Sequence, residues 1–241
     1  IAPDFSEDNL LRDYAPYQFD LDAARREMAL SAYDRNGDGV CDDPACDKVF
    51  ALDTLGEAEP HTEQVWIDGI RQIGINLEIR RIPQDNNRFY EISADPTRKI
   101  ALNLGMFWFA DYPSISSFFP DQFRAEGIGH LPFGNVSLIG ARPDELEAWG
   151  YDVTSVPNVD AKVGECLSFT GFAQTRCWAE LDQALMTKVV PWVPQVVLEF
   201  SQVASDRVVR FAVDQAFQFI APDQIALAVA NMTSYEEIAA L

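Results

Sequence analysis

The residues best suited to chemistry form an acidic turn at positions 34–40, which reads Asp-Arg-Asn-Gly-Asp-Gly-Val. Carboxylate or amide oxygens stand at the first, third and fifth positions, and the glycine at the sixth permits a sharp turn. This is the front half of an EF-hand-type calcium loop. Its expected ligands are the side chains of Asp34, Asn36 and Asp38, the carbonyl of Val40, and one or more of Asp42, Asp43 and Asp47.

The loop departs from the usual calcium pattern at its twelfth position, where Ala45 replaces the bidentate glutamate. A short disulfide between Cys41 and Cys46 would fold the intervening acids back over the ion, so we expect a structural site rather than a sensor. The alternative is a metal-free turn whose aspartates cap their own backbone. The mutual repulsion of the aspartates between positions 34 and 47 favours calcium.

The four cysteines fall into two local pairs, Cys41 with Cys46 and Cys166 with Cys177, although four cysteines allow three connectivities. Local pairing predicts two disulfides and therefore an oxidising compartment. The alternative is four free thiols in a cytosolic protein.

A second candidate site is the aromatic stretch at positions 107–113, which embeds one carboxylate among rings. It follows a short apolar strand pattern, and ligands of open α/β sheets bind beyond the carboxyl ends of strands. There Asp111 would accept a ligand ammonium while aromatic side chains supply walls and cation–π contacts. The candidate wall residues are Phe107, Trp108, Phe109 and Tyr112. The alternative is that the rings belong to the core and Asp111 caps the turn before Pro113.

Composition and motifs exclude several classes of function. The chain has 241 residues, 48% of them hydrophobic, and a formal net charge of −20, so it can bury a core but repels nucleic acid. No G-x-S-x-G, H-E-x-x-H or phosphate-loop motif is present. His61 and His130 are the only histidines, and we expect each to be a surface or capping residue. We therefore predict a protein that is not an enzyme.

The elements that must position these residues follow from hydrophobic spacing. We predict a helix at 21–33, a strand at 49–55, a helix at 61–74 and a strand at 75–82, an order that implies a parallel pair of strands. A helix at 87–94 and a buried strand at 100–104 follow. The proline-rich region after Tyr112 is expected to be irregular. Beyond it we predict a helix at 173–190, β-rich stretches at 195–203 and 207–213, and a last helix at 222–230.

Several segments, in the same order, resemble the family 5 extracellular solute-binding proteins, the peptide-binding components of ABC importers. Residues 107–113 are similar to the family's G-W-x-A-D-Y-P segment, and 17–24 to its Y-D-P-E-K-A-K helix start. Residues 63–77 are similar to its L-x-x-I-G-I-x-V helix and strand, and 177–194 to its late helix and P-x-V-P-L turn.

The resemblance implies an α/β, periplasmic-binding-protein-like (type II) C-terminal lobe with a mixed sheet flanked by helices. Residues 1–194 would form this lobe, and 195–241 a return segment that packs on an N-terminal lobe expected to precede Ile1. By resemblance, Asp111 binds the amino terminus of a peptide and Trp108 lines a side-chain pocket. Phe107 stands where the family has glycine, which would narrow the pocket.

The expected function is capture of a peptide or similar small solute between two lobes, for delivery to the membrane permease of an ABC transporter. The expected location is extracellular or periplasmic, with a lipid anchor through the missing N-terminus as one option. Two alternatives stay open. One is a secreted carbohydrate-active hydrolase with an Asp/Glu pair in an aromatic groove, and the other is a calcium-stabilised interaction module.

Overall fold

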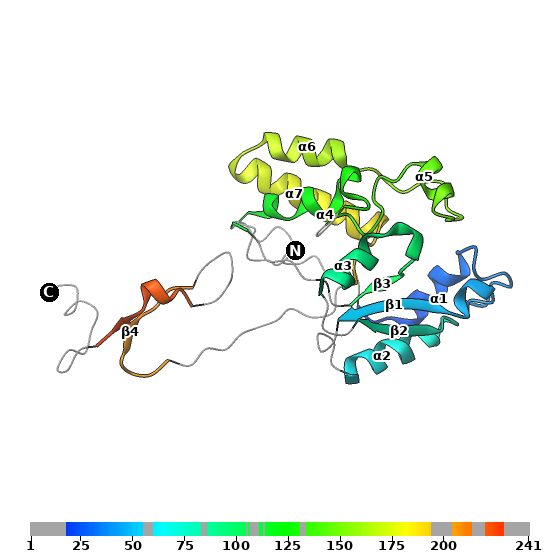
Figure 1. Ribbon diagram of the computed structural model, residues 1–241, viewed down its shortest axis with the longest axis horizontal. Coiled ribbons are helices and arrows are strands. Elements are labelled where there is room, and N and C mark those ends of the chain that lie inside the picture. The colour runs from blue at the N-terminus through cyan, green and yellow to red at the C-terminus, as the bar shows by residue number, and fades with distance from the viewer. Residues whose placement is uncertain are drawn as a thin grey trace.

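The computed structural model describes residues 18–54, 60–82, 86–104, 106, 111–112, 114–130, 134–193, 204–213 and 220–228. Within these residues the chain is a mixture of helices and short strands, in line with the expected α/β class (Figure 1). No helix in this part of the chain is long and apolar enough to cross a membrane.

A small parallel sheet organises the first half of the described chain. Its strands are β1 (Val49–Thr54), β2 (Leu77–Ile82) and β3 (Leu102–Asn103). They lie in the order β2-β1-β3, and β1 pairs in parallel with both neighbours, as the strand–helix–strand order predicts. We expected a mixed sheet, but every described strand of this sheet is parallel.

Two crossover helices cover the sheet, α2 (Pro60–Arg71) and α3 (Asn86–Ala94). They lie on opposite sides of it (Figure 1). The first connection runs from β1 to the neighbour on one side, and the second returns past β1 to the other side, so two right-handed crossovers place their helices on opposite faces. Such a reversal of direction is the topological switch point beside which open α/β sheets bind ligands.

The calcium-like loop connects α1 (Leu21–Ala29) to β1, and its cysteines pack between α1 and the turn before β2. Asp20 caps α1 by accepting a hydrogen bond from the N–H of Ala23 at 2.9 Å. The helix ends four residues earlier than predicted, where the chain turns into the loop. A disulfide joins Cys41 to Cys46, and this pair packs with Met28 from the helix. The same cluster includes Ile73 and Ile75, from the turn between α2 and β2.

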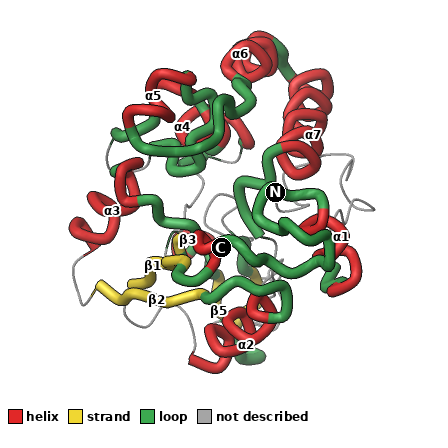
Figure 2. The backbone as a smooth tube through the Cα atoms, turned by 90° about the vertical axis from the view of Figure 1, so that its right-hand side faces the viewer, coloured by secondary structure: helices red, strands yellow, loops and turns green. Residues whose placement is uncertain are grey.

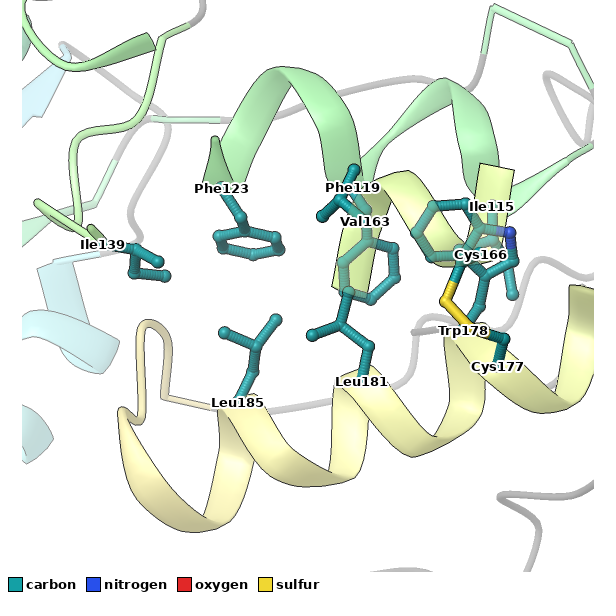
Figure 3. Close-up of a cluster of buried hydrophobic side chains, with 10 residues drawn as sticks. All are labelled: Ile115, Phe119, Phe123, Ile139, Val163, Cys166, Cys177, Trp178, Leu181 and Leu185. Atoms are coloured by element: carbon teal, nitrogen blue, oxygen red, sulfur yellow. A yellow bond between two sulfur atoms is a disulfide. The ribbon is translucent and has the colours of Figure 1, made fainter. Parts of the chain in front are cut away.

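The second half of the described chain is a layer of helices gathered beside the sheet (Figure 2). These are α4 (Phe119–Phe123), α5 (Pro143–Ala148), α6 (Asp160–Ser168) and α7 (Gly171–Lys188). The helix predicted at 173–190 is confirmed as α7, and it buries one face, because Trp178, Leu181 and Leu185 are each no more than 2% exposed. Trp178 stacks on Phe119 with ring centroids 5.4 Å apart (Figure 3).

The second predicted disulfide, Cys166–Cys177, lies inside this core and joins α6 to α7 (Figure 3). Contacts across the two layers come from the turn between α3 and β3. The hydroxyl of Tyr151 donates to the carbonyl of Pro96 at 3.1 Å, and the ammonium of Lys99 donates to the carbonyl of Gly150. The helical layer is thereby fixed to the amino end of β3.

The expectation of an irregular region after Tyr112 is wrong in part, because the short helices α4, α5 and α6 lie there, although most of the described residues between them are turns and loops. Two of the prolines that suggested irregular chain, Pro120 and Pro143, stand in the first turn of α4 and α5, where proline costs no hydrogen bond.

The final described segments form an antiparallel hairpin of β4 (Val208–Arg210) and β5 (Ala226–Leu227). The predicted helix at 222–230 is wrong in its described part, because one 3-10 turn at Pro222–Gln224 leads directly into β5. Strand pairing with β4 satisfies this backbone instead. The predicted β-rich stretch at 195–203 lies outside the described residues. The hairpin stands apart from the main body (Figure 1) and exposes apolar side chains, namely Phe211, Val213, Ile225 and Leu227.

Candidate functional site

The carboxyl edge of the parallel sheet, where β1 and its neighbours end, gathers charged side chains from three elements. Asp53 is the fifth residue of β1, and its register partner on β2 is Arg81. Partners on adjacent strands project from the same face of a sheet. Glu63 reaches the same group of side chains from the first turn of α2. The fold therefore brings two carboxylates and one guanidinium together beside the switch point.

The two acids of this cluster, hereafter the acid pair, are buried, whereas the base is half-exposed. Asp53 is 0% exposed and Glu63 is 6% exposed, whereas 43% of the Arg81 side chain is accessible. The guanidinium of Arg81 donates to Oε2 of Glu63, and its Nε lies 3.8 Å from Oδ2 of Asp53. With both acids ionised, neither oxygen of Asp53 nor Oε1 of Glu63 has a side-chain hydrogen-bond donor among the described residues. The acid pair is therefore only partly compensated.

The electrostatic consequence is a shifted ionisation of Asp53. Burial, the neighbouring negative charge of Glu63 and a hydrogen bond in which the two carboxyl groups share a proton raise the pKa of Asp53 from 3.8 to about 6, and the attraction of Arg81 offsets only part of this. Strongly shifted carboxyl groups are concentrated at functional sites.

The predicted aromatic site falls only partly within the described residues. Phe107, Trp108 and Phe109 lie outside them. Asp111 and Tyr112 are both exposed, and the hydroxyl of Tyr112 lies 3.1 Å from Oγ of Ser116. In the sequence Asp111 comes eight residues after the end of β3, the strand that pairs in parallel with β1. An exposed carboxylate is compatible with a ligand anchor and with a turn cap alike.

The calcium-like loop is built around the side chain of Asp34, which is 8% exposed. Its Oδ1 accepts hydrogen bonds from the N–H groups of Asn36 and Gly37, and its Oδ2 accepts one from Gly39 at 2.7 Å. Burial raises the pKa of Asp34, but these backbone hydrogen bonds outweigh burial and lower it. Asn36 and Asp38 each accept a backbone N–H two residues later. The loop geometry is thus set by its own side chains.

The remaining predicted calcium ligands differ in their availability. Oδ1 of Asp42 accepts the N–H of Arg35, which folds Asp42 back across the loop. Asp43 is committed elsewhere, because it caps the 3-10 turn at the N–H of Ala45 and forms an ion pair with Arg35. Asp47 ends that turn. No three His, Cys, Asp or Glu side chains in the described residues are grouped as metal ligands. A calcium site here therefore depends on Asn36 and the Val40 carbonyl as well as on carboxylates.

A cavity of about 360 Å³ lies elsewhere, in the helical layer. Its lining includes His130, Arg142 and Trp149. Gly150 follows Trp149 of the cavity lining, and its carbonyl accepts a hydrogen bond from the ammonium of Lys99. Lys99 precedes the amino end of β3, so the cavity lies away from the carboxyl edge of the sheet. The guanidinium of Arg142 is already paired with Asp144 and Glu145. His130 is exposed, as predicted, whereas the side chain of His61 lies outside the described residues.

The acid pair and Arg81 are not among the residues predicted from the sequence. One signal was available, because Asp53 is a charged residue within an otherwise apolar strand pattern, and a buried strand rarely carries an unpaired acid. The partnership with Glu63 and Arg81 depends on strand register and on the placement of α2, which spacing does not encode.

The comparisons with known proteins assign no family. No family model matches the chain, and no curated protein matches it at a significant level. Function is therefore inferred from the side chains at the carboxyl edge and from the resemblance of the sequence motifs.

Proposed function

We propose that this chain is the ligand-binding lobe of a solute-binding protein that captures a small amine-bearing solute, such as a peptide, at the carboxyl edge of its parallel sheet. The supporting observation is the strand order β2-β1-β3, which creates a switch point where acidic side chains gather. Asp111 is the proposed anchor for the ligand ammonium. The aromatic residues before it supply the wall.

The exposed hairpin of β4 and β5 supports the proposed return segment. Apolar side chains such as Phe211 and Leu227 are half-exposed on it, and an N-terminal lobe packed there would cover them. In this proposal the two lobes close around the solute, and the closed form docks on an ABC permease. The two disulfides are compatible with an extracellular or periplasmic location.

We also propose a structural calcium ion in the loop at 34–47. The buried, N–H-bonded carboxylate of Asp34 suits the first position of such a loop, and Asn36, Asp38, Asp42 and the Val40 carbonyl are the further donors. A bound ion would neutralise their mutual repulsion and hold α1 and the turn before β2 to one another.

Calorimetric titration of the protein together with its proposed N-terminal lobe, using trialanine, trilysine, glucose and maltotriose, tests the proposal, because one lobe alone keeps only one wall of the site. We expect saturable, reversible binding of a peptide, weakened in Asp111→Asn by about 1.5 to 3 kcal/mol because a charge-assisted hydrogen bond is lost. Asp152→Asn is the control, since Asp152 is exposed and lies in the loop after Tyr151. Equal affinity of Asp111→Asn and the wild type would refute the role of Asp111.

One observation favours the hydrolase alternative. The acid pair combines a carboxyl group of raised pKa with a second carboxylate, and glycosidases use two such groups as their catalytic residues. Release of sugar products from maltotriose, abolished in Asp53→Asn, would favour that alternative over capture.

A further inference from the structure

The cavity of about 360 Å³ in the helical layer is separate from the carboxyl edge of the sheet and from the calcium-like loop. Its volume lies within the range of small-molecule pockets. The residues that line it combine one aromatic side chain with aliphatic surface and several polar groups. They include Trp149, Ile128, Glu126, His130, Arg142 and Asn158. The cavity can therefore hold a small organic molecule that has both an apolar face and polar edges.

Hydrogen bonds hold the walls of this cavity in place. Asn135 is 2% exposed, and its Nδ2 donates to the carbonyls of Arg124 and Ile139 at 3.1 and 2.7 Å. Its Oδ1 accepts the N–H of Ile139. The N–H of Gly140, in the cavity lining, donates to the carbonyl of Pro157 at 2.9 Å. These bonds connect segments that line the cavity, so its shape is set in advance and a ligand orders little of the protein when it binds.

The charged side chains at the cavity already have partners of opposite charge. The guanidinium of Arg142 lies 3.1 Å from Asp144 and 3.0 Å from Glu145. Glu126 pairs with Arg124 at 3.4 Å. A charged ligand would compete with these ion pairs and would also lose its own hydration. The lining therefore favours a neutral ligand.

The hydrogen-bonding capacity that remains in the lining suits hydroxyl groups. A guanidinium carries five N–H donors, so Arg142 keeps donors beyond those directed at its acidic partners. A carboxylate has about four acceptor sites, so Glu126 and Glu145 keep free lone pairs. A hydroxyl both donates and accepts, so it can use neighbouring donors and acceptors together. A neutral ring with several hydroxyls matches this lining, and Trp149 offers an aromatic surface to the C–H face of such a ring.

We propose that this cavity binds a sugar ring, as a free monosaccharide or as the terminal unit of an oligosaccharide. The sugar stacks its C–H face on Trp149 and directs its hydroxyls toward Arg142, Glu126 and His130. This inference does not depend on the proposed capture of peptides, because the cavity lies away from the carboxyl edge of the sheet. It adds a second small-molecule site, within the helical layer.

Ligand-observed NMR titration of the protein with glucose, galactose, mannose and N-acetylglucosamine tests the inference. At least one of these sugars should bind saturably at millimolar concentrations, and Trp149→Ala should weaken that binding about tenfold or more. Trp66→Ala is the matched control and should leave it unchanged, because Trp66 is also partly buried but lies on α2, outside the cavity lining. His130→Ala removes an exposed lining side chain and should weaken binding about threefold or more, which gives a second readout should Trp149→Ala fail to fold. Thermal melts verify the folding of each variant.

Three results would overturn the inference. Absence of saturable binding of all four sugars would mean that the cavity holds no sugar ring. Sugar binding that is unchanged in both Trp149→Ala and His130→Ala would place the sugar elsewhere on the protein. Binding of choline or inorganic phosphate in place of the sugars, lost in Trp149→Ala, would assign the cavity to a charged ligand. In each case the capture of tripeptides is a separate measurement, since it depends on Asp111 and not on Trp149.

Discussion

Replacement of Asp53 by asparagine should stabilise the protein at neutral pH and lose that advantage in acid. Asparagine keeps the shape of the side chain but removes the buried charge. The folded-state pKa of Asp53 is about 6 and its ordinary value is 3.8. Because the folded value is raised, the folded state binds the proton more tightly, so the stability that this group contributes is fully present below about pH 3.8 and is lost as the pH rises through about 6.

The magnitude follows from the gap between the two pKa values. At about 1.4 kcal/mol per pH unit, an ionised Asp53 costs the folded state about 3 kcal/mol at pH 7.5. The same linkage gives a cost of about 2 kcal/mol at pH 5 and less than about 1 kcal/mol at pH 4. Asp53→Asn should therefore exceed the wild type in unfolding free energy by these amounts.

Urea unfolding followed by tryptophan fluorescence at these three pH values measures the difference. Other carboxylates, such as Asp34 and Asp43, have lowered pKa values, so their contribution to the stability of the protein is lost in acid. This loss is the same in Asp53→Asn and in the wild type, and it cancels in the difference between them. The exposed Asp152→Asn should differ from the wild type by less than about 0.5 kcal/mol at each pH. If Asp53→Asn is less stable than the wild type at pH 7.5, Arg81 compensates the acid pair fully and the reasoning is wrong.

Three other perturbations address the loop and the two disulfide-linked regions. If calcium occupies residues 34–47, a chelator should lower the melting temperature and added calcium should restore it; an unchanged melting temperature would contradict the site. Replacing Cys166 and Cys177 with serine should cost about 2 to 3 kcal/mol of unfolding free energy, because the bond closes a loop with a sequence separation of 11, and equal urea midpoints would argue otherwise. Gly74→Ala should lose more than about 1 kcal/mol, since Gly74 has a φ of 82° and an added Cβ would lie 2.6 Å from the Cys41 carbonyl oxygen. Gly164→Ala, in α6 with open space around it, is the control and should gain up to about 1 kcal/mol in the same unfolding assay.

The sequence by itself determined the elements that depend on local patterns. The strand at β1, the crossover to β2 and the buried face of α7 follow from hydrophobic spacing, and the parallel pairing follows from the length of the crossover. Both disulfides were predictable because their cysteines are close in sequence. Pro120 and Pro143 led to the prediction of irregular chain where α4 and α5 lie. Proline disrupts a helix at most positions but is accommodated in its first turn.

The tertiary structure alone decided which charges meet. Asp53 and Arg81 are 28 positions apart in the printed sequence, and only the parallel register of β1 with β2 makes them neighbours. Glu63 joins them because α2 folds back over the sheet. An ionised side chain acquires an unusual pKa or a ligand role from the burial and the charges around it, and these are properties of packing across strands rather than of neighbours along the chain.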